Sequence, residues 1–152
     1  MLQQFAQLLD DWFSENSIEL LVQGSGADRA ELLRRFKADT GSVLFGTDSF
    51  WQGVDVPGAA LSNVIITKLP FAVPTHPLIA GRIEHIKAKG QNPFFSYQLP
   101  AAIIKFKQGF GRLIRNKTDT GIVVVLDSRI LHKGYGRDFI AAIEKCRIEI
   151  AE

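Results

Sequence analysis

Two short runs rich in valine and isoleucine constrain the fold of this chain more than any other feature. They span Ser62 to Thr67 and Gly121 to Leu126, and polar residues do not alternate with apolar ones inside them. Strands of this kind are typical of parallel sheets, whose two faces are covered by helices. We therefore expect both runs to be strands of an α/β fold that are buried on both faces.

Helix and strand patterns alternate along the rest of the chain. The predicted helices lie near residues 2–13, 30–36, 78–89 and 137–148, and the further strands at 18–23 and 42–47. With 152 residues and 46% hydrophobic content, the chain has the size of one domain, placed at residues 1–152. We expect a doubly wound, mostly parallel sheet with helices on both faces, which binds ligands at the carboxyl ends of its strands.

The segment QGFGRLIR, residues 108–115, predicts the end of another helix with one polar and one apolar face. Gln108, Arg112 and Arg115 are four and three residues apart, so they share one face. Apolar side chains form the opposite face: Ile103, Phe106, Phe110 and Leu113. Two guanidiniums and an amide directed away from the core suit a phosphate, which arginine binds through paired hydrogen bonds.

Two glycines argue against the simpler interpretation, in which both arginines are merely solvated side chains on the helix surface. Gly109 and Gly111 each cost a helix roughly 1 kcal/mol relative to alanine. Such a cost is tolerable where a ligand approaches the backbone closely, so we favour a ligand-binding helix.

Positive charge is concentrated in the second half of the chain. The net charge is only +2, but the segment from His85 to Thr118 holds seven Lys or Arg residues and no acid. We expect a local basic surface that attracts an anionic ligand. The aromatic residues Phe94, Phe95 and Tyr97 of this segment either belong to the core or stack on nucleic-acid bases.

The segment FWQGVDVPG is a second ligand-binding candidate, because the loop from Thr47 to Gly58 follows a predicted strand. Gly53 allows close approach to the backbone, and Asp55 offers a carboxylate to a ribose hydroxyl. The chain contains no G-x-x-x-x-G-K-[ST] phosphate loop. An aspartate loop and an arginine-bearing helix without a phosphate loop point to a domain that completes an NTP site formed by another domain.

Other motifs have simpler explanations. GSGADR, residues 24–29, follows a strand as a dinucleotide fingerprint would, but Arg29 occupies the third glycine position, so we expect a turn. Asp127 is expected to brace Arg129 rather than to hold magnesium.

Cys146 is the only cysteine and the three histidines are scattered, so we predict no disulfide and no bound metal. Nothing resembles a signal peptide or a membrane span, and we expect a cytoplasmic protein without a membrane partner.

The order of these motifs resembles the second RecA-like motor domain of the DinG helicases, relatives of XPD within helicase superfamily 2. The resemblance covers about Ile18 to Phe139 and rests on five segments: SVLFGTDSFWQGVDVPG, NVIITKLPF, PLIAGRIE, NPFFSYQLPAAIIKFKQGFGRLIR and DTGIVVVLDSR. It implies a RecA-like form of the doubly wound fold.

The resemblance also implies roles for particular residues. Arg112 and Arg115 would be arginine fingers that act on the nucleotide. The other residues implied are Gly53, Asp55 and Gln108 at the nucleotide, and Gly46, Thr47 and Ser49 at the DNA backbone. Gln52 departs from the glutamate common in the family, which puts any acid role at this position in doubt.

The function so implied is that of an ATP-dependent DNA helicase that moves on single-stranded DNA from 5′ to 3′. ATP and Mg²⁺ would be bound mainly by the N-terminal RecA-like domain of the same helicase, the first motor domain, which is absent here. The chain alone is therefore expected not to hydrolyse ATP. A strand that precedes Leu2 in the family is missing too, and the exposed sheet edge is expected to favour self-association.

The sequence leaves two alternatives open. The chain could be a stand-alone nucleic-acid-binding or interaction module without motor activity, which a Walker loop upstream in the same reading frame would argue against. It could also be an unrelated nucleotide-binding α/β enzyme, which tight ATP binding by the chain alone would favour.

Overall fold

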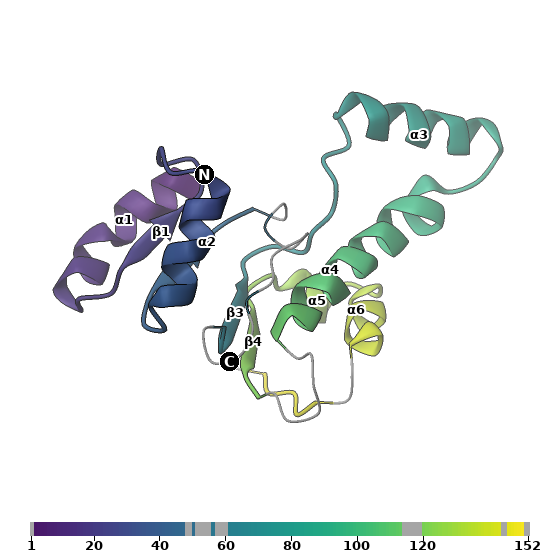
Figure 1. Cartoon of the computed structure of the whole chain (residues 1–152). Coiled ribbons are helices and arrows are strands. Elements are labelled where there is room, and N and C mark those ends of the chain that lie inside the picture. The colour runs from purple at the N-terminus through teal and green to yellow at the C-terminus, as the bar shows by residue number, and fades with distance from the viewer. Residues whose placement is uncertain are drawn as a thin grey trace. The chain divides into compact units, whose positions relative to one another are not determined.

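The computed structural model describes residues 2–47, 50, 56, 61–113, 120–143 and 146–150. The chain divides into two compact units (Figure 1). The first unit comprises Met1–Val64 and Arg112–Ile122, and the second comprises Ile65–Gly111 and Val123–Glu152.

The first unit contains a parallel pair of strands joined through a helix. Its elements are α1 (Leu2–Glu15), β1 (Leu20–Val22), α2 (Arg29–Ala38) and β2 (Val43–Phe45). β1 and β2 run parallel with Leu21 opposite Leu44, and α1 and α2 both contact β1 (Figure 1). These are the two helices and two strands predicted for this part of the chain, with shorter strands than expected. The β1–α2–β2 order is the connection that a parallel pair requires.

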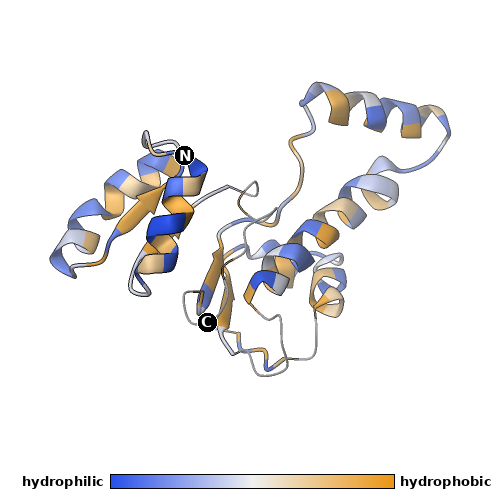
Figure 2. Ribbon diagram, in the orientation of Figure 1, coloured by the Kyte–Doolittle hydropathy of each residue, from blue (hydrophilic) through white to orange (hydrophobic). Residues whose placement is uncertain are grey.

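One apolar cluster holds the first unit together. Apolar residues, orange in Figure 2, recur along α1 and α2, although Phe5, Leu8 and Trp12 of α1 are exposed. The buried members of the cluster are Leu21, Leu32, Phe36, Phe50 and Val56. Burial of side chains of this size stabilises the fold by about 1.5–3 kcal/mol each.

The GSGADR segment forms a turn, as predicted. Gly24 has φ +84° and Gly26 has φ +107°, values that glycine adopts without strain. Asp28 then caps α2, because its carboxylate accepts a hydrogen bond from the Glu31 N–H at 2.8 Å.

The second parallel pair consists of β3 (Asn63–Ile66) and β4 (Ile122–Val125). The Ile122 N–H donates to the Ser62 carbonyl and the Leu126 N–H donates to the Ile66 carbonyl, both at 3.0 Å. From the first bond to the second, the residue numbers of donor and acceptor both rise by four, so the two strands run parallel. The connecting chain forms α3 (Pro77–Ala88), the π-helix η3 (Phe94–Gln98) and α4 (Leu99–Leu113), and α5 (Arg129–His132) and α6 (Gly136–Ala142) follow β4.

The prediction that these two strands are buried on both faces is wrong. Ile66 is 2% exposed, whereas Ile65 and Ile122 are each 61% exposed. Burial alternates because side chains of a strand point to opposite faces in turn, and only one face of this two-stranded sheet is covered within the described residues.

The last predicted helix is also too long. α6 ends at Ala142, Ile143 is extended, and residues 146–150 are not helical. The remaining predicted helices are confirmed within a few residues at their ends. No described helix combines the length and apolar character that a membrane crossing requires.

Asp127 ties the ends of β3 and β4 together. Its carboxylate accepts hydrogen bonds from the Leu69 N–H at 2.9 Å and from the backbone and guanidinium of Arg129. The prediction that Asp127 braces Arg129 is confirmed. The hydrogen bond from the Arg129 side chain is the main reason why the pKa of Asp127 falls from 3.8 to about 2, and the two backbone N–H donors lower it further.

We expect Asp127→Ala to lower the free energy of unfolding by about 2–3 kcal/mol, because it leaves the buried Leu69 N–H without its acceptor. Urea denaturation measures this. The matched control is Glu31→Ala, which breaks the exposed pair with Arg34 and should cost much less, because solvent screens an exposed ion pair.

The cost should depend on pH. Because the pKa of Asp127 is lower in the folded state than in the unfolded chain, the carboxylate stabilises the fold above about pH 4 and loses this effect as pH falls towards 2. The difference between wild type and Asp127→Ala should therefore shrink over this interval. A difference that stays constant would show that the carboxylate charge is not what stabilises the strand ends.

Candidate functional site

The end of α4 carries the described part of the arginine motif. Gln108 is exposed and Arg112 is half-buried, and four residues separate them on one face of the helix. On the opposite face Phe106 is 1% and Leu113 is 5% exposed. The predicted division of this helix into a polar and an apolar face is confirmed for these residues. Arg115 lies outside the described residues.

The surface beside Arg112 is open at Gly111. A Cβ added at Gly111 would meet no described atom within 4 Å. Gly111 is three residues after Gln108, so it belongs to the polar face. This face therefore has room for a ligand close to the helix backbone. Its position in the last turn also favours positive charge, because the carbonyl end of a helix attracts cations.

Gly46 and Thr47 lie at the carboxyl end of β2, where a ligand of a parallel sheet would bind. The backbone N–H of Thr47 donates to Gln23 Oε1 at 2.8 Å, and the Thr47 hydroxyl donates to the same oxygen at 3.0 Å. The Gln23 N–H in turn donates to the Phe45 carbonyl at 2.9 Å. Gln23 thus fixes the chain where it leaves β2.

Gly46 has a packing explanation of its own. A Cβ at this position would lie 3.0 Å from Cγ of Phe50, closer than side chains normally approach. Phe50 is a core residue, and the Arg29 guanidinium lies 5.4 Å from its ring centroid. Arg29 therefore covers Phe50, which explains why an arginine occupies the place of a third fingerprint glycine.

The remaining predicted site residues fall outside the described part of the chain. They are Ser49, Gly53, Asp55 and Arg115. Phe50 and Val56, which flank Gly53 and Asp55 in the sequence, are both members of the first unit's core.

Asp127 offers no magnesium ligand, since Leu69 and Arg129 already engage both of its carboxylate oxygens. Among the described residues, no three His, Cys, Asp or Glu side chains are grouped so that they could hold a metal ion. The arrangement that the structure does provide, an amide and a guanidinium on one helix face, fits the anionic part of a nucleotide.

Sequence reasoning did not identify Gln23 as a residue of the site. Its polar side chain at the end of an apolar strand, two residues after the buried Leu21, could have suggested a role at the carboxyl edge. The partner residue, however, is 24 positions away, and only the parallel pairing of β1 and β2 brings it near.

The chain matches the helicase C-terminal domain family over residues 1–146. It is 44% identical over 144 residues to the protein named 3′-5′ exonuclease DinG of Bacillus subtilis, an alignment that covers 94% of this chain and 16% of the relative. Identity to the ATP-dependent DNA helicase YoaA of Haemophilus influenzae is 46% over 136 residues, covering 89% and 21% of the two chains. Identity to the ATP-dependent DNA helicase DinG of Photobacterium profundum is 43% over 132 residues, covering 85% and 19%.

The chain thus spans about a fifth or less of the length of these curated relatives. The predicted resemblance to the DinG helicases is confirmed by the family match and by these identities. The chain belongs to the helicase C-terminal domain family and is a DinG-type member of it.

Proposed function

We propose that this chain is the second, RecA-like motor domain of a cytoplasmic ATP-dependent DNA helicase, and that residues 1–152 form this one domain. The observation that carries the proposal is the polar face at the end of α4, where Gln108 and Arg112 lie opposite the buried Phe106 and Leu113. Arg115 continues the same spacing in the sequence. This face would act on the phosphates of a nucleotide.

Two features support a RecA-like, doubly wound architecture. β1 and β2 are parallel and joined through α2, and β3 and β4 are parallel and joined through α3 and α4. Repeated β–α–β units of this kind are the building blocks of doubly wound sheets.

The nucleotide would be held mainly by another domain of the same protein. This chain has no phosphate loop, and Asp127 is engaged by Leu69 and Arg129 rather than open to magnesium. The relatives are about five to six times as long as the matched segment, which leaves room for a first RecA-like domain that binds ATP and Mg²⁺. In this chain Gly53 and Asp55 would face the nucleotide together with Gln108.

Arg112 and Arg115 would act as arginine fingers. As the γ-phosphate is transferred to water, negative charge spreads over its oxygens, and two guanidiniums would stabilise that charge. Closing of the two motor domains on ATP and reopening after hydrolysis would move the protein along single-stranded DNA, from 5′ to 3′.

Gly46, Thr47 and Ser49 would contact the DNA backbone. The bonds from Thr47 to Gln23 support this role, because they hold the chain in one position at the carboxyl edge of the first sheet.

In the full-length protein, Arg112→Ala and Arg115→Ala should each lower the DNA-stimulated ATPase rate by about 10³-fold, the lower end of the loss seen for arginine fingers. Binding to single-stranded DNA should be largely retained. Steady-state phosphate release and fluorescence anisotropy measure the two properties.

Lys107→Ala is the matched control, because Lys107 is an exposed cation on the same helix but points away from the Gln108–Arg112 face. It should leave the ATPase rate within about twofold. If either arginine variant kept a near-normal rate, that arginine would not be a finger.

Gly111→Ala tests whether a ligand approaches the α4 backbone. Alanine is the better helix former, so the variant should gain about 0.5–1 kcal/mol in the free energy of unfolding. Because the added methyl group would stand on the helix surface one turn after Gln108, where the nucleotide is proposed to approach the backbone, the ATPase rate of the full-length protein should fall by about 10- to 100-fold.

Gly81→Ala in α3 is the control for the helix effect, since a Cβ there also meets no described atom within 4 Å. It should stabilise similarly and leave the ATPase rate unchanged. A Gly111→Ala protein that is both more stable and fully active would contradict the proposed approach of the nucleotide.

A further inference from the structure

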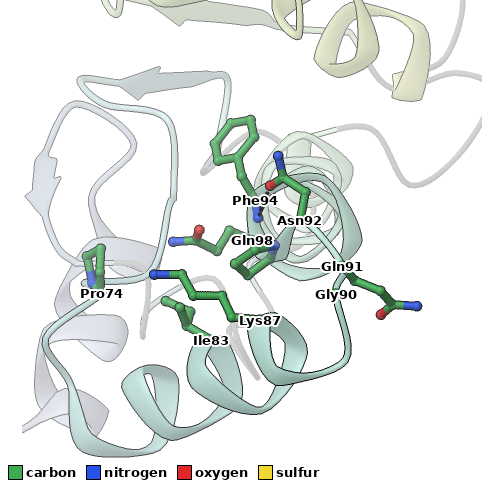
Figure 3. A pocket seen from close by; sticks show the side chains of 9 residues that line it. Pro74, Ile83, Lys87, Gly90, Gln91, Asn92, Phe94 and Gln98 are labelled. Carbon is green, nitrogen blue, oxygen red and sulfur yellow. Dashed lines mark hydrogen bonds between the residues drawn. The ribbon is translucent and has the colours of Figure 1, made fainter.

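A cavity of about 670 Å³ lies where the end of α3 faces η3. The side chains of Lys87 and Gln98 extend over Ile83 towards Pro74, whereas the Gln91 amide points away (Figure 3). All residues that line the cavity belong to the second unit, and none is among the proposed nucleotide-site residues. Its volume is in the range of ~300–1,000 Å³ that is typical of small-molecule sites.

Phe94, at one border of the cavity, is held in place by other aromatic rings. The ring of Phe94 stacks on Phe71 with centroids 5.8 Å apart and an interplanar angle of 21°, and the Tyr135 centroid lies 5.3 Å away. The Phe94 N–H donates to Asn92 Oδ1 at 2.9 Å. Phe94 is therefore fixed both through its ring and through its backbone.

A π-helical turn sets the directions of the lining residues. η3 runs from Phe94 to Gln98, and the Leu99 N–H donates to the Phe94 carbonyl five residues earlier. Turns of this type are rare and occur frequently at functional sites. Both ends of η3, Phe94 and Gln98, line the cavity.

The lining combines flat apolar surfaces with amides and one cation. Pro74, Ile83 and Phe94 are the apolar members, Asn92 and Gln98 supply amides, and Lys87 supplies the positive charge. Among the described residues, no acidic side chain lines the cavity. A nucleobase has this complementary chemistry, with two apolar faces and an edge of donors and acceptors, and its phosphate suits an ammonium group.

The surroundings favour a base that belongs to a polymer over a free nucleotide. The chain from His85 to Thr118 contains no acid, so repeated phosphates would be attracted along it. Phe95 makes a T-shaped contact with Phe94, with centroids 5.2 Å apart, and is 62% exposed, so part of its ring is accessible to a neighbouring base. Tyr97 differs, because it is half-buried and the Arg82 guanidinium lies 5.5 Å from its ring centroid.

We propose that this cavity holds one unstacked nucleotide of the bound single strand, with its base against Ile83 and Pro74, its edge at Gln98 and its phosphate at Lys87. This inference rests on the proposed function, since it assigns a specific contact to the DNA on which the helicase acts. It adds α3 and η3 to the DNA-binding surface, which the motif residues Gly46, Thr47 and Ser49 do not include.

The test uses the full-length protein and labelled thymidine strands in which a single abasic position is moved along the strand. Fluorescence anisotropy gives the dissociation constant for each strand. Loss of the base at one position should weaken wild-type binding by about tenfold, because the apolar contacts of the base in the cavity, like base stacking in other single-strand sites, contribute strongly to binding.

Gln98→Ala should remove most of this positional penalty. If the base and the Gln98 side chain contact each other, removing the base costs little once the side chain is gone, so the two losses are not additive. Gln91→Ala is the matched control, because Gln91 also borders the cavity but its amide points away from it (Figure 3), and it should keep the penalty. Lys87→Gln should reduce the slope of log affinity against log salt by about 0.7, the value for one phosphate of a single strand. Lys89→Gln, at an exposed lysine that does not line the cavity, should change the slope by less than half as much.

The outcomes separate this inference from the proposed function. If the protein bound no single-stranded DNA, both would be wrong. If it bound DNA but no position were sensitive, or the sensitive position persisted in both Gln98→Ala and Lys87→Gln, only the base-binding cavity would be wrong. Displacement of the strand by an acidic peptide in a Lys87-dependent manner, without any positional effect, would instead identify a protein-docking site and overturn the inference.

Discussion

Each parallel pair of strands is fastened at its carboxyl end by one polar side chain. Gln23 accepts hydrogen bonds from the backbone and hydroxyl of Thr47, which follows β2, and Asp127 accepts one from the Leu69 N–H, which follows β3. Parallel strands cannot be joined by a tight hairpin, so their ends need such tertiary bonds to stay in register. These bonds fix the edge of each sheet from which ligand-binding loops leave, and the position of any site there depends on them.

Elements with a strong hydrophobic period could be predicted from the sequence, whereas those set by tertiary contacts could not. The helices α1, α2 and α4 and the brace from Asp127 to Arg129 were predictable, because spacing and neighbouring charges define them locally. The four-residue α5 is too short to show a period, and the five-residue bond of η3 has no sequence pattern. The exposed faces of β3 and β4 were not predictable either, because apolar content alone does not show which face of a sheet is covered by helices.

In the candidate site, too, only the features set by local spacing could be predicted from the sequence. The polar face of α4 followed from the spacing of Gln108 and Arg112, and its apolar face from that of Phe106 and Leu113. Gln23 and the cavity beside Lys87 depend on segments brought together by the fold. We propose that this chain supplies the arginines and that another domain supplies the phosphate loop. This division explains why a chain with arginines suited to phosphate has no phosphate loop of its own.

The most direct test of this division is a structure of the full-length protein with single-stranded DNA, Mg²⁺ADP and aluminium fluoride, which stands in for the transferred phosphoryl group. We expect the guanidiniums of Arg112 and Arg115 to lie at hydrogen-bond distance, about 2.7–3.2 Å, from the fluoride ligands, with the phosphate loop on the other motor domain. If the two domains were closed on the nucleotide while both arginines pointed to DNA or to solvent, the finger assignment would be contradicted.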